Sequence, residues 1–134
     1  MKILFASADD AGRSQIAAAF VNALAPSDIR AFSAGNRPAA AVHPEVVAVM
    51  REAGIDLSAA RPQKLTPARA RAAGFLVTLG WSGDCAGFRG SRLDWPLADP
   101  QGGSIPAVRA IRDEIRNRVL SLVAEISANR GNRR

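Results

Sequence analysis

The segment from Ser7 to Ser14 combines a hydroxyl group, a guanidinium group and several small residues, a set that could bind an anion. The residues between Ser7 and Arg13 are small or acidic: Ala8, Asp9, Asp10, Ala11 and Gly12. Arginine can hold a tetrahedral oxyanion through two forked hydrogen bonds. Small residues let backbone N–H groups point at one anion, and the positive end of a following helix adds to the attraction. The segment predicts an oxyanion-binding loop, although the same residue types also form ordinary strand-to-helix turns.

This 7–14 loop is expected to connect a strand to a helix. Apolar character at 2–7 is typical of a buried strand, and the Ala-rich stretch 14–25 has apolar residues at helical spacing before Pro26. Further strands are predicted at 29–35, 75–80 and the start of 93–103, a loop at 80–92, and further helices at 43–54, after Thr66 and at 104–126. This alternation predicts a three-layer α/β fold with a four-stranded parallel sheet and helices on both faces. Ligands of such folds bind at the carboxyl ends of strands, where the loop lies.

Composition sets the domain organisation and the class of partner. The 134 residues predict one domain over 1–128, followed by a basic, disordered tail at 129–134. The net charge of +6 includes three arginines in this tail, aromatic residues make up only 5%, and tyrosine is absent. This pattern argues against a nucleic-acid partner, because sheets that bind RNA alternate aromatic and basic side chains.

Location and metal content follow from equally simple features. No apolar run is long enough to span a bilayer, and Met1 and Lys2 lead directly into the first strand, so a cytoplasmic protein without a membrane partner is expected. Cys85 is the only cysteine and His43 the only histidine. One of each cannot form an internal disulfide or a closed zinc site, so no metal and no cofactor are expected.

Motifs along almost the whole chain carry a family resemblance. The stretch FASADDAGRSQIAAAF (5–20) resembles the first strand, Cys-x5-Arg loop and helix of the family of low-molecular-weight protein tyrosine phosphatases and thiol-coupled arsenate reductases. Matching segments follow in the same order: FSAG (32–35), VHPEVVAVMREAGIDLS (42–58), RPQKLT (61–66), LVTLG (76–80), DWPLADP (94–100) and IRDEIRNRV (111–119). AGRSQ and DWPLADP are closer to the bacterial arsenate reductase branch. The resemblance implies the family's fold and its oxyanion loop.

Two departures from the family concern sulfur. Ser7 occupies the position of the family's nucleophilic cysteine, and a serine hydroxyl, unlike a thiol, is not ionised by a helix N-terminus and an arginine. Ser14 corresponds to the residue that steadies the family's thiolate. In the segment where the resembling reductases carry cysteines, Trp81 takes the first position and Cys85 the second. Arsenate reduction needs a second thiol to leave as a disulfide, so the resemblance implies that no internal thiol relay and no thiol-redox partner operate.

The third departure is Asp10, where the family has an asparagine that fixes the turn. Aspartate has nearly the same shape, but its charge opposes a bound dianion; we expect Asp10 to point outward and brace the loop. Asp9 is a milder departure. Asp99, in ADP, matches the aspartate that protonates the leaving group in the phosphatases, although Asp before Pro is also an ordinary turn residue.

Other candidates receive no chemical role. His43 is read as a cap or surface residue, and Phe88 and Trp95 as packing or pocket-wall residues. The sequence thus predicts an arsenate reductase-like, phosphatase-like protein that binds phosphate, sulfate or arsenate weakly and is inactive or impaired. Two alternatives stay open: a Cys-to-Ser trapping variant of an active phosphatase or arsenate reductase, and a non-catalytic, regulatory oxyanion-binding protein.

Overall fold

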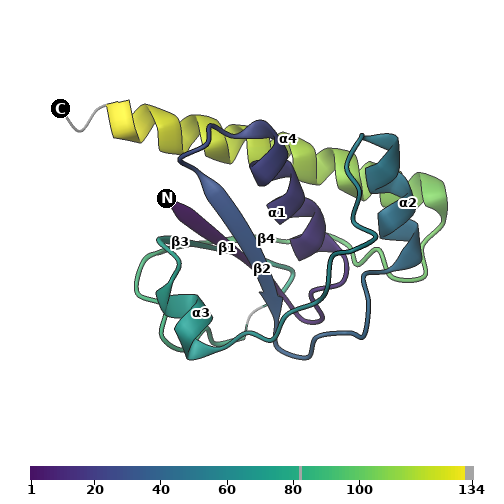
Figure 1. Ribbon diagram of the computed structural model, residues 1–134, viewed down its shortest axis with the longest axis horizontal. Helices are drawn as coiled ribbons and strands as arrows, with labels where there is room; N and C mark the ends of the chain where they lie inside the picture. The colour runs from purple at the N-terminus through teal and green to yellow at the C-terminus, as the bar shows by residue number, and fades with distance from the viewer. Residues whose placement is uncertain (82, 132–134) are drawn as a thin grey trace.

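The computed structural model describes residues 1–81 and 83–131 and has the predicted parallel sheet (Figure 1). The elements are β1 (Lys2–Ser7), α1 (Arg13–Leu24), β2 (Arg30–Gly35), α2 (Pro44–Glu52), α3 (Pro67–Arg71), β3 (Phe75–Leu79), β4 (Ser91–Trp95) and α4 (Ile105–Gly131). The strand order is β2-β1-β3-β4, and every pair is parallel. The predicted fold class, a four-stranded parallel sheet covered by helices, is confirmed.

The strand register brings the functional loops to one end of the sheet. The last residue of β1, Ser7, lies opposite Gly35 of β2, and Ala6 lies opposite Thr78 of β3. In a parallel sheet the carboxyl ends of neighbouring strands lie at the same edge. The loops that follow β1, β2 and β3 therefore meet at the carboxyl end of the central strand.

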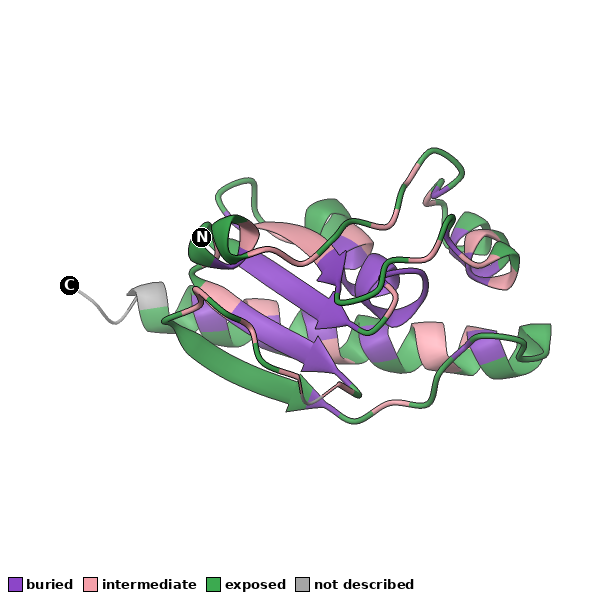
Figure 2. Ribbon diagram, turned by 90° about the horizontal axis from the view of Figure 1, so that it is seen from below, coloured by how far each residue is buried: buried purple, intermediate pink, exposed green. Residues whose placement is uncertain are grey.

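Helices cover the two faces of the sheet unequally. The larger core lies between one face and α1, α2 and α4, and includes Ile16, Val46 and Ile115, each with no exposed surface. The opposite face carries a smaller cluster around Leu4 and Leu76, covered by α3 and the segment after β3. Figure 2 shows buried residues along β1 and β3, whereas β4 at the sheet edge is exposed.

Local sequence signals explain where several helices begin and end. Thr66 caps α3 as predicted, since its hydroxyl accepts a hydrogen bond of 3.2 Å from the Arg69 amide, and Pro67 takes the first helical position. After α2, Gly54 has a φ of +81°, the left-handed conformation that ends a helix. Arg109 and Arg112 of α4 both bind the carboxylate of Glu52, which ties α2 to α4.

Two boundaries differ from the sequence predictions. β4 begins at Ser91, inside the stretch 80–92 that was expected to be a loop. The last helix reaches Gly131, so residues 129–131 are helical although the sequence placed them in the disordered tail. Neither proline nor glycine interrupts the chain between Ile126 and Gly131, and backbone hydrogen bonding continues beyond the apolar stripe. The remainder of the tail, 132–134, lies outside the described residues.

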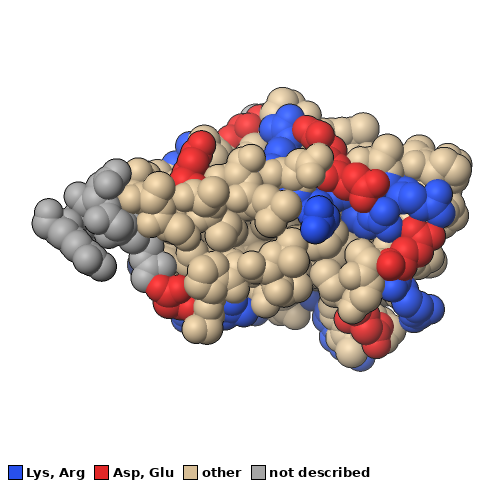
Figure 3. All heavy atoms as spheres, turned by 90° about the horizontal axis from the view of Figure 1, so that it is seen from above, with Lys and Arg blue, Asp and Glu red and all other residues tan. Residues whose placement is uncertain are grey.

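The surface and the longest helix limit the kinds of partner. Figure 3 shows Lys and Arg side chains interspersed with Asp and Glu on the face that bears α2 and the start of α4. Such mixing gives no extended basic patch on that face. Within the described part of the chain, no helix is both long and apolar enough to cross a membrane.

Candidate oxyanion-binding site

The 7–14 loop runs from the end of β1 into the first turn of α1 and is largely enclosed. Ser7, Asp10, Arg13 and Ser14 are all buried, and Ser14 and Asp10 have no exposed surface. Gly35 of β2 permits this close packing, because a Cβ atom there would lie 2.8 Å from the Asp10 amide nitrogen. The loop is thus held against the end of the neighbouring strand.

A chain of hydrogen bonds links three polar side chains inside the loop. Ser7 Oγ lies 2.8 Å from Ser14 Oγ, and the Ser14 hydroxyl donates a 2.7 Å hydrogen bond to Asp10 Oδ1. The Asp10 amide also donates to Ser7 Oγ over 3.1 Å. The nucleophile position is therefore connected to a buried carboxylate through one hydroxyl.

Asp10 is the brace of the loop. Its φ of +51° lies in the left-handed region, which Asp tolerates better than most residues. Oδ2 accepts a 2.8 Å hydrogen bond from the Gln63 amide, and the Asp10 carbonyl accepts one from Gln15 Nε2. Burial raises the pKa of the Asp10 carboxyl, partly offset by its hydrogen bonds from Ser14 and Gln63. The carboxylate is directed at Ser14 and at the segment around Gln63, as expected for a bracing residue, but it is buried rather than outward-facing.

Arg13 and several backbone amides remain to bind an anion. Arg13 passes alongside Gly80, and its Nη1 donates a 2.7 Å hydrogen bond to the Leu97 carbonyl. A guanidinium group carries five N–H donors, so one bond leaves most of them available. The amides of Asp10 and Ala11 donate within the loop. Four further loop amides donate to no described protein atom, namely those of Ala8, Asp9, Gly12 and Arg13.

His43 contacts the loop, which the sequence interpretation missed. Its Nε2 lies 3.2 Å from Asp9 Oδ2, and its amide donates to the Ala11 carbonyl over 3.0 Å. The Asp9 carboxylate is thereby held by His43 on one oxygen and by the Ala11 amide on the other. The one sequence signal was the His-Pro pair that begins α2, which indicates a helix start but no contact with a distant loop.

Asp99 lies on a segment that approaches the loop, but its carboxylate is engaged elsewhere. A Cβ atom on Gly12 would come within 2.7 Å of Pro100 Cγ, so the chain next to Asp99 lies against the loop. Asp99 itself is exposed, and Oδ1 accepts a 2.9 Å hydrogen bond from the Gln101 amide. This geometry is that of an Asx turn. The general-acid role of Asp99 stays a prediction.

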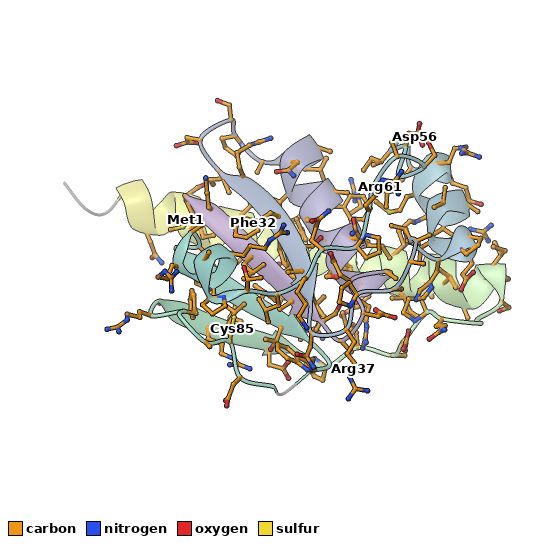
Figure 4. The ribbon with its side chains drawn as sticks, turned by 60° about the horizontal axis from the view of Figure 1, so that its bottom comes forward. Met1, Phe32, Arg37, Asp56, Arg61 and Cys85 are labelled. Carbon is orange, nitrogen blue, oxygen red and sulfur yellow. The ribbon has the colours of Figure 1, made fainter. Side chains whose placement is uncertain are left out.

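Trp81 and Cys85 pack against the smaller cluster on the α3 face of the sheet. Cys85 is labelled in Figure 4. Cys85 is partly buried, and burial raises the pKa of its thiol, with a smaller opposing effect of Arg92. Phe88 belongs to the same cluster, whereas Trp95 is buried in the larger core with its ring centre 5.7 Å from that of Phe5. The lone thiol is thus an apolar packing group with weak thiolate character.

One surface hollow opens at the opposite end of the sheet from the loop. It has a volume of about 400 Å³ and is lined by residues of β1, β2 and α3: Lys2, Arg30, Ala31, Phe32, Ala68, Arg69 and Ala72. Lys2 and Arg30 begin their strands. Because ligands of this architecture bind at carboxyl strand ends, this hollow is separate from the candidate site.

Comparison with known proteins agrees with this architecture. The model of the family described as low molecular weight phosphotyrosine protein phosphatase matches residues 2–82. A glutaredoxin arsenate reductase of Synechocystis sp. is 30% identical, with 94% of this chain and 98% of that protein covered. The solved structure of a Corynebacterium glutamicum thioredoxin-dependent arsenate reductase has a TM-score of 0.82 and 33% identity over 96% of this chain; this chain spans 62% of that relative. An arsenate reductase solved in a phosphate-binding state has a TM-score of 0.81 and 28% identity, covering 93% of this chain and 98% of its own.

Proposed function

The chain belongs to the low molecular weight phosphotyrosine protein phosphatase family, and we propose that its 7–14 loop binds a tetrahedral oxyanion such as phosphate, sulfate or arsenate without thiolate chemistry. The observation that carries this proposal is the set of hydrogen-bond donors that remain available at the loop. Arg13 is buried and has one nitrogen, Nη1, bonded to the Leu97 carbonyl, and four backbone amides of the loop donate to no described protein atom. The start of α1 adds the positive end of its dipole. A related arsenate reductase solved in a phosphate-binding state supports the same ligand class.

Sustained turnover is not expected. At position 7 a hydroxyl replaces the thiol, and the only thiol in the chain, Cys85, lies in the cluster on the α3 face with a raised pKa. Reduction of arsenate consumes two thiols in forming a disulfide. We therefore propose a family member that has lost the arsenate reductase activity of its named relatives and retains their anion site.

Affinity for the anion depends on the balance between Arg13 and two aspartates. At an effective dielectric constant of about 20, two unit charges about 4 Å apart interact by about 4 kcal/mol. Asp10 is turned toward Ser14 and Gln63, and Asp9 toward His43, so both carboxylates face protein donors. Their repulsion lowers the affinity without cancelling Arg13, which predicts weak binding.

Calorimetric titration with sulfate tests this proposal. Wild-type protein should bind one sulfate weakly, Arg13→Ala should abolish the signal, and Asp10→Asn should strengthen it. Arg51→Ala, which removes an exposed arginine from α2, is the matched control and should bind as wild type does. Unchanged binding in Arg13→Ala, or no binding even in Asp10→Asn, would show that the loop does not hold anions.

A further inference from the structure

The outer edge of β4 is the open edge of the sheet. The strand order β2-β1-β3-β4 gives β4 one neighbour among the described strands, and four of its five residues are exposed along the rim of the molecule (Figure 2). On the opposite edge, the Asn22 side chain holds the N–H and C=O groups of Ala31 in β2. The Gln63 carbonyl and the Leu65 amide likewise hold Gly35. Unpaired backbone groups at an edge can pair with a strand of another chain, so the edge of β4 is a candidate interaction surface.

The backbone direction of β4 determines which of its groups face outward. The Trp95 carbonyl accepts a 3.0 Å hydrogen bond from the amide of Gly80, the residue that follows β3, so the Trp95 carbonyl points toward β3. The backbone groups of successive strand residues point to alternate sides of the strand. Leu93, two residues earlier, therefore also directs its N–H and C=O groups at β3. Those of Arg92 and Asp94 point outward, at the open edge.

The two residues with outward-pointing backbone groups carry opposite charges. Arg92 and Asp94 are both exposed, and their spacing of two places them on the same face of the sheet. In a second β4 that runs antiparallel, with the two Leu93 residues opposite each other, Arg92 lies opposite the partner's Asp94. Each such pair exchanges two backbone hydrogen bonds. Opposite charges on directly opposed residues stabilise a pair of strands, whereas a parallel copy in register would place like charges together.

We propose that two copies of this chain associate through antiparallel pairing of β4, with the twofold axis at Leu93, so that one continuous sheet runs through both copies. The interface is isologous, and each ion pair in it occurs twice. Arg92 Nη2 donates a 3.2 Å hydrogen bond to the Gly83 carbonyl, which leaves other guanidinium donors for the partner. Asp94 Oδ1 accepts a hydrogen bond from the Thr78 hydroxyl, and Oδ2 accepts from no described residue. The inference does not depend on the anion site, because β3 separates β4 from β1.

The α4 side of the strand supplies an apolar contact to the same interface. Leu93 is 39% exposed and borders a hollow of about 240 Å³ between β4 and α4, which Trp95 and Leu122 also line. In the antiparallel pair the partner's Leu93 lies directly opposite, without backbone hydrogen bonds between the two and with their Cα atoms about 4.5 Å apart. The two leucines then cover apolar surface that a single copy leaves in water. Pro96 has no N–H group and ends the ladder after Asp94, so the interface is short and the dimer is weak.

Sedimentation equilibrium of charge variants, from micromolar to millimolar protein, tests the proposal. Wild-type protein should dimerise, and Arg92→Asp should raise the dissociation constant by about tenfold or more, because it places two carboxylates opposite each other twice. Arg92→Asp also lowers the net charge from +6, which by itself eases association. Combining Arg92→Asp with Asp94→Arg reverses both ion pairs and should restore dimerisation. Arg116→Asp makes the same charge change at an exposed position of α4 outside the hollow and should not weaken the dimer.

A disulfide across the twofold axis tests the register without altering any charge. In a Cys85→Ala background, Leu93→Cys should oxidise rapidly to a covalent dimer, because a separation of about 4.5 Å between Cα atoms lies within the range of disulfides. Leu120→Cys in the same background is the matched control, since Leu120 is 40% exposed on α4, and it should stay largely monomeric. A monomeric wild type throughout the concentration range would overturn the proposal. So would equal dissociation constants for Arg92→Asp and Arg116→Asp, or equal oxidation rates for the two cysteine variants.

Discussion

A cysteine placed at position 7 should be a poor nucleophile as long as Asp10 is present. Two hydrogen bonds, of 2.8 and 2.7 Å, connect Ser7 Oγ to the Asp10 carboxylate. At a separation of about 5 Å and an effective dielectric constant of about 20, a thiolate and this carboxylate repel by about 3 kcal/mol. At about 1.36 kcal/mol per unit, that repulsion raises the thiol pKa by about two units. Ser7→Cys alone should therefore fail to recreate a reactive thiolate, and Ser7→Cys with Asp10→Asn should succeed.

The measurement is the pKa of the thiol introduced by Ser7→Cys, followed by thiolate absorbance in the ultraviolet, in a Cys85→Ala background. The variant that also carries Asp10→Asn should titrate about two units lower than the variant that retains Asp10. Asp9→Asn serves as the comparison, since Asp9 binds His43 and the Ala11 amide rather than Ser14, and it should lower the pKa by less. Equal effects of the two aspartates, or a pKa of the introduced thiol that Asp10→Asn leaves in place, would refute the assigned hydrogen-bond chain.

Three further predictions test the scaffold. Hydrogen bonds from two α4 arginines lower the pKa of Glu52 to about 2. The stabilising effect of the ionised Glu52 is therefore present above pH 4.5 and is lost as the pH falls through that lowered value. Glu52→Gln should melt at a lower temperature than wild type at neutral pH, and the difference between the two melting temperatures should vanish near pH 2. Burial raises the pKa of Cys85, so a disulfide reagent should label it more slowly than a free thiol until denaturant is added. Ile115→Ala should cost about 2–5 kcal/mol of unfolding free energy, because Ile115 of α4 is 0% exposed. Leu120→Ala, on the same helix, should cost less than about 0.5 kcal/mol, because Leu120 is 40% exposed. Equal losses of unfolding free energy in the two variants would contradict the orientation of α4.

The sheet and its helices could be predicted because their signals are local. Alternating apolar runs and helical periodicities indicated each strand and helix. Thr66 and Pro67 marked the start of α3, where the Thr66 hydroxyl accepts a hydrogen bond from the amide of Arg69, three residues further along the chain. The end of α4 was missed for the same reason. The apolar stripe stops at Ile126, whereas the helix continues to Gly131 on backbone hydrogen bonds that no side-chain pattern reports.

The contacts that orient the loop could not be predicted, because their partners are distant in sequence. The Gln63 amide reaches Asp10 across 53 residues, and the Leu97 carbonyl reaches Arg13 across 84. Both partners are backbone atoms, which any residue type could supply. The sequence therefore indicated which side chains gather at the loop, but only the folded chain determines which atom of Asp10 faces a donor.

The response of sulfate binding to Asp10→Asn distinguishes two roles of Asp10, as a charge in the hydrogen-bond chain and as a brace of the loop. With aspartate, the Ser7 proton is directed at Ser14 and away from an anion held by the loop. With asparagine, Ser14 donates to Ser7, which frees the Ser7 proton to donate to the anion while a nearby negative charge disappears. Sulfate should consequently bind more tightly to Asp10→Asn than to wild type. A substitution that merely loosened the loop would weaken sulfate binding, since Asp10 also anchors the Gln63 amide. Weaker sulfate binding in Asp10→Asn would therefore assign Asp10 a bracing role alone, whereas tighter binding requires the hydrogen-bond chain from Ser7 to Asp10.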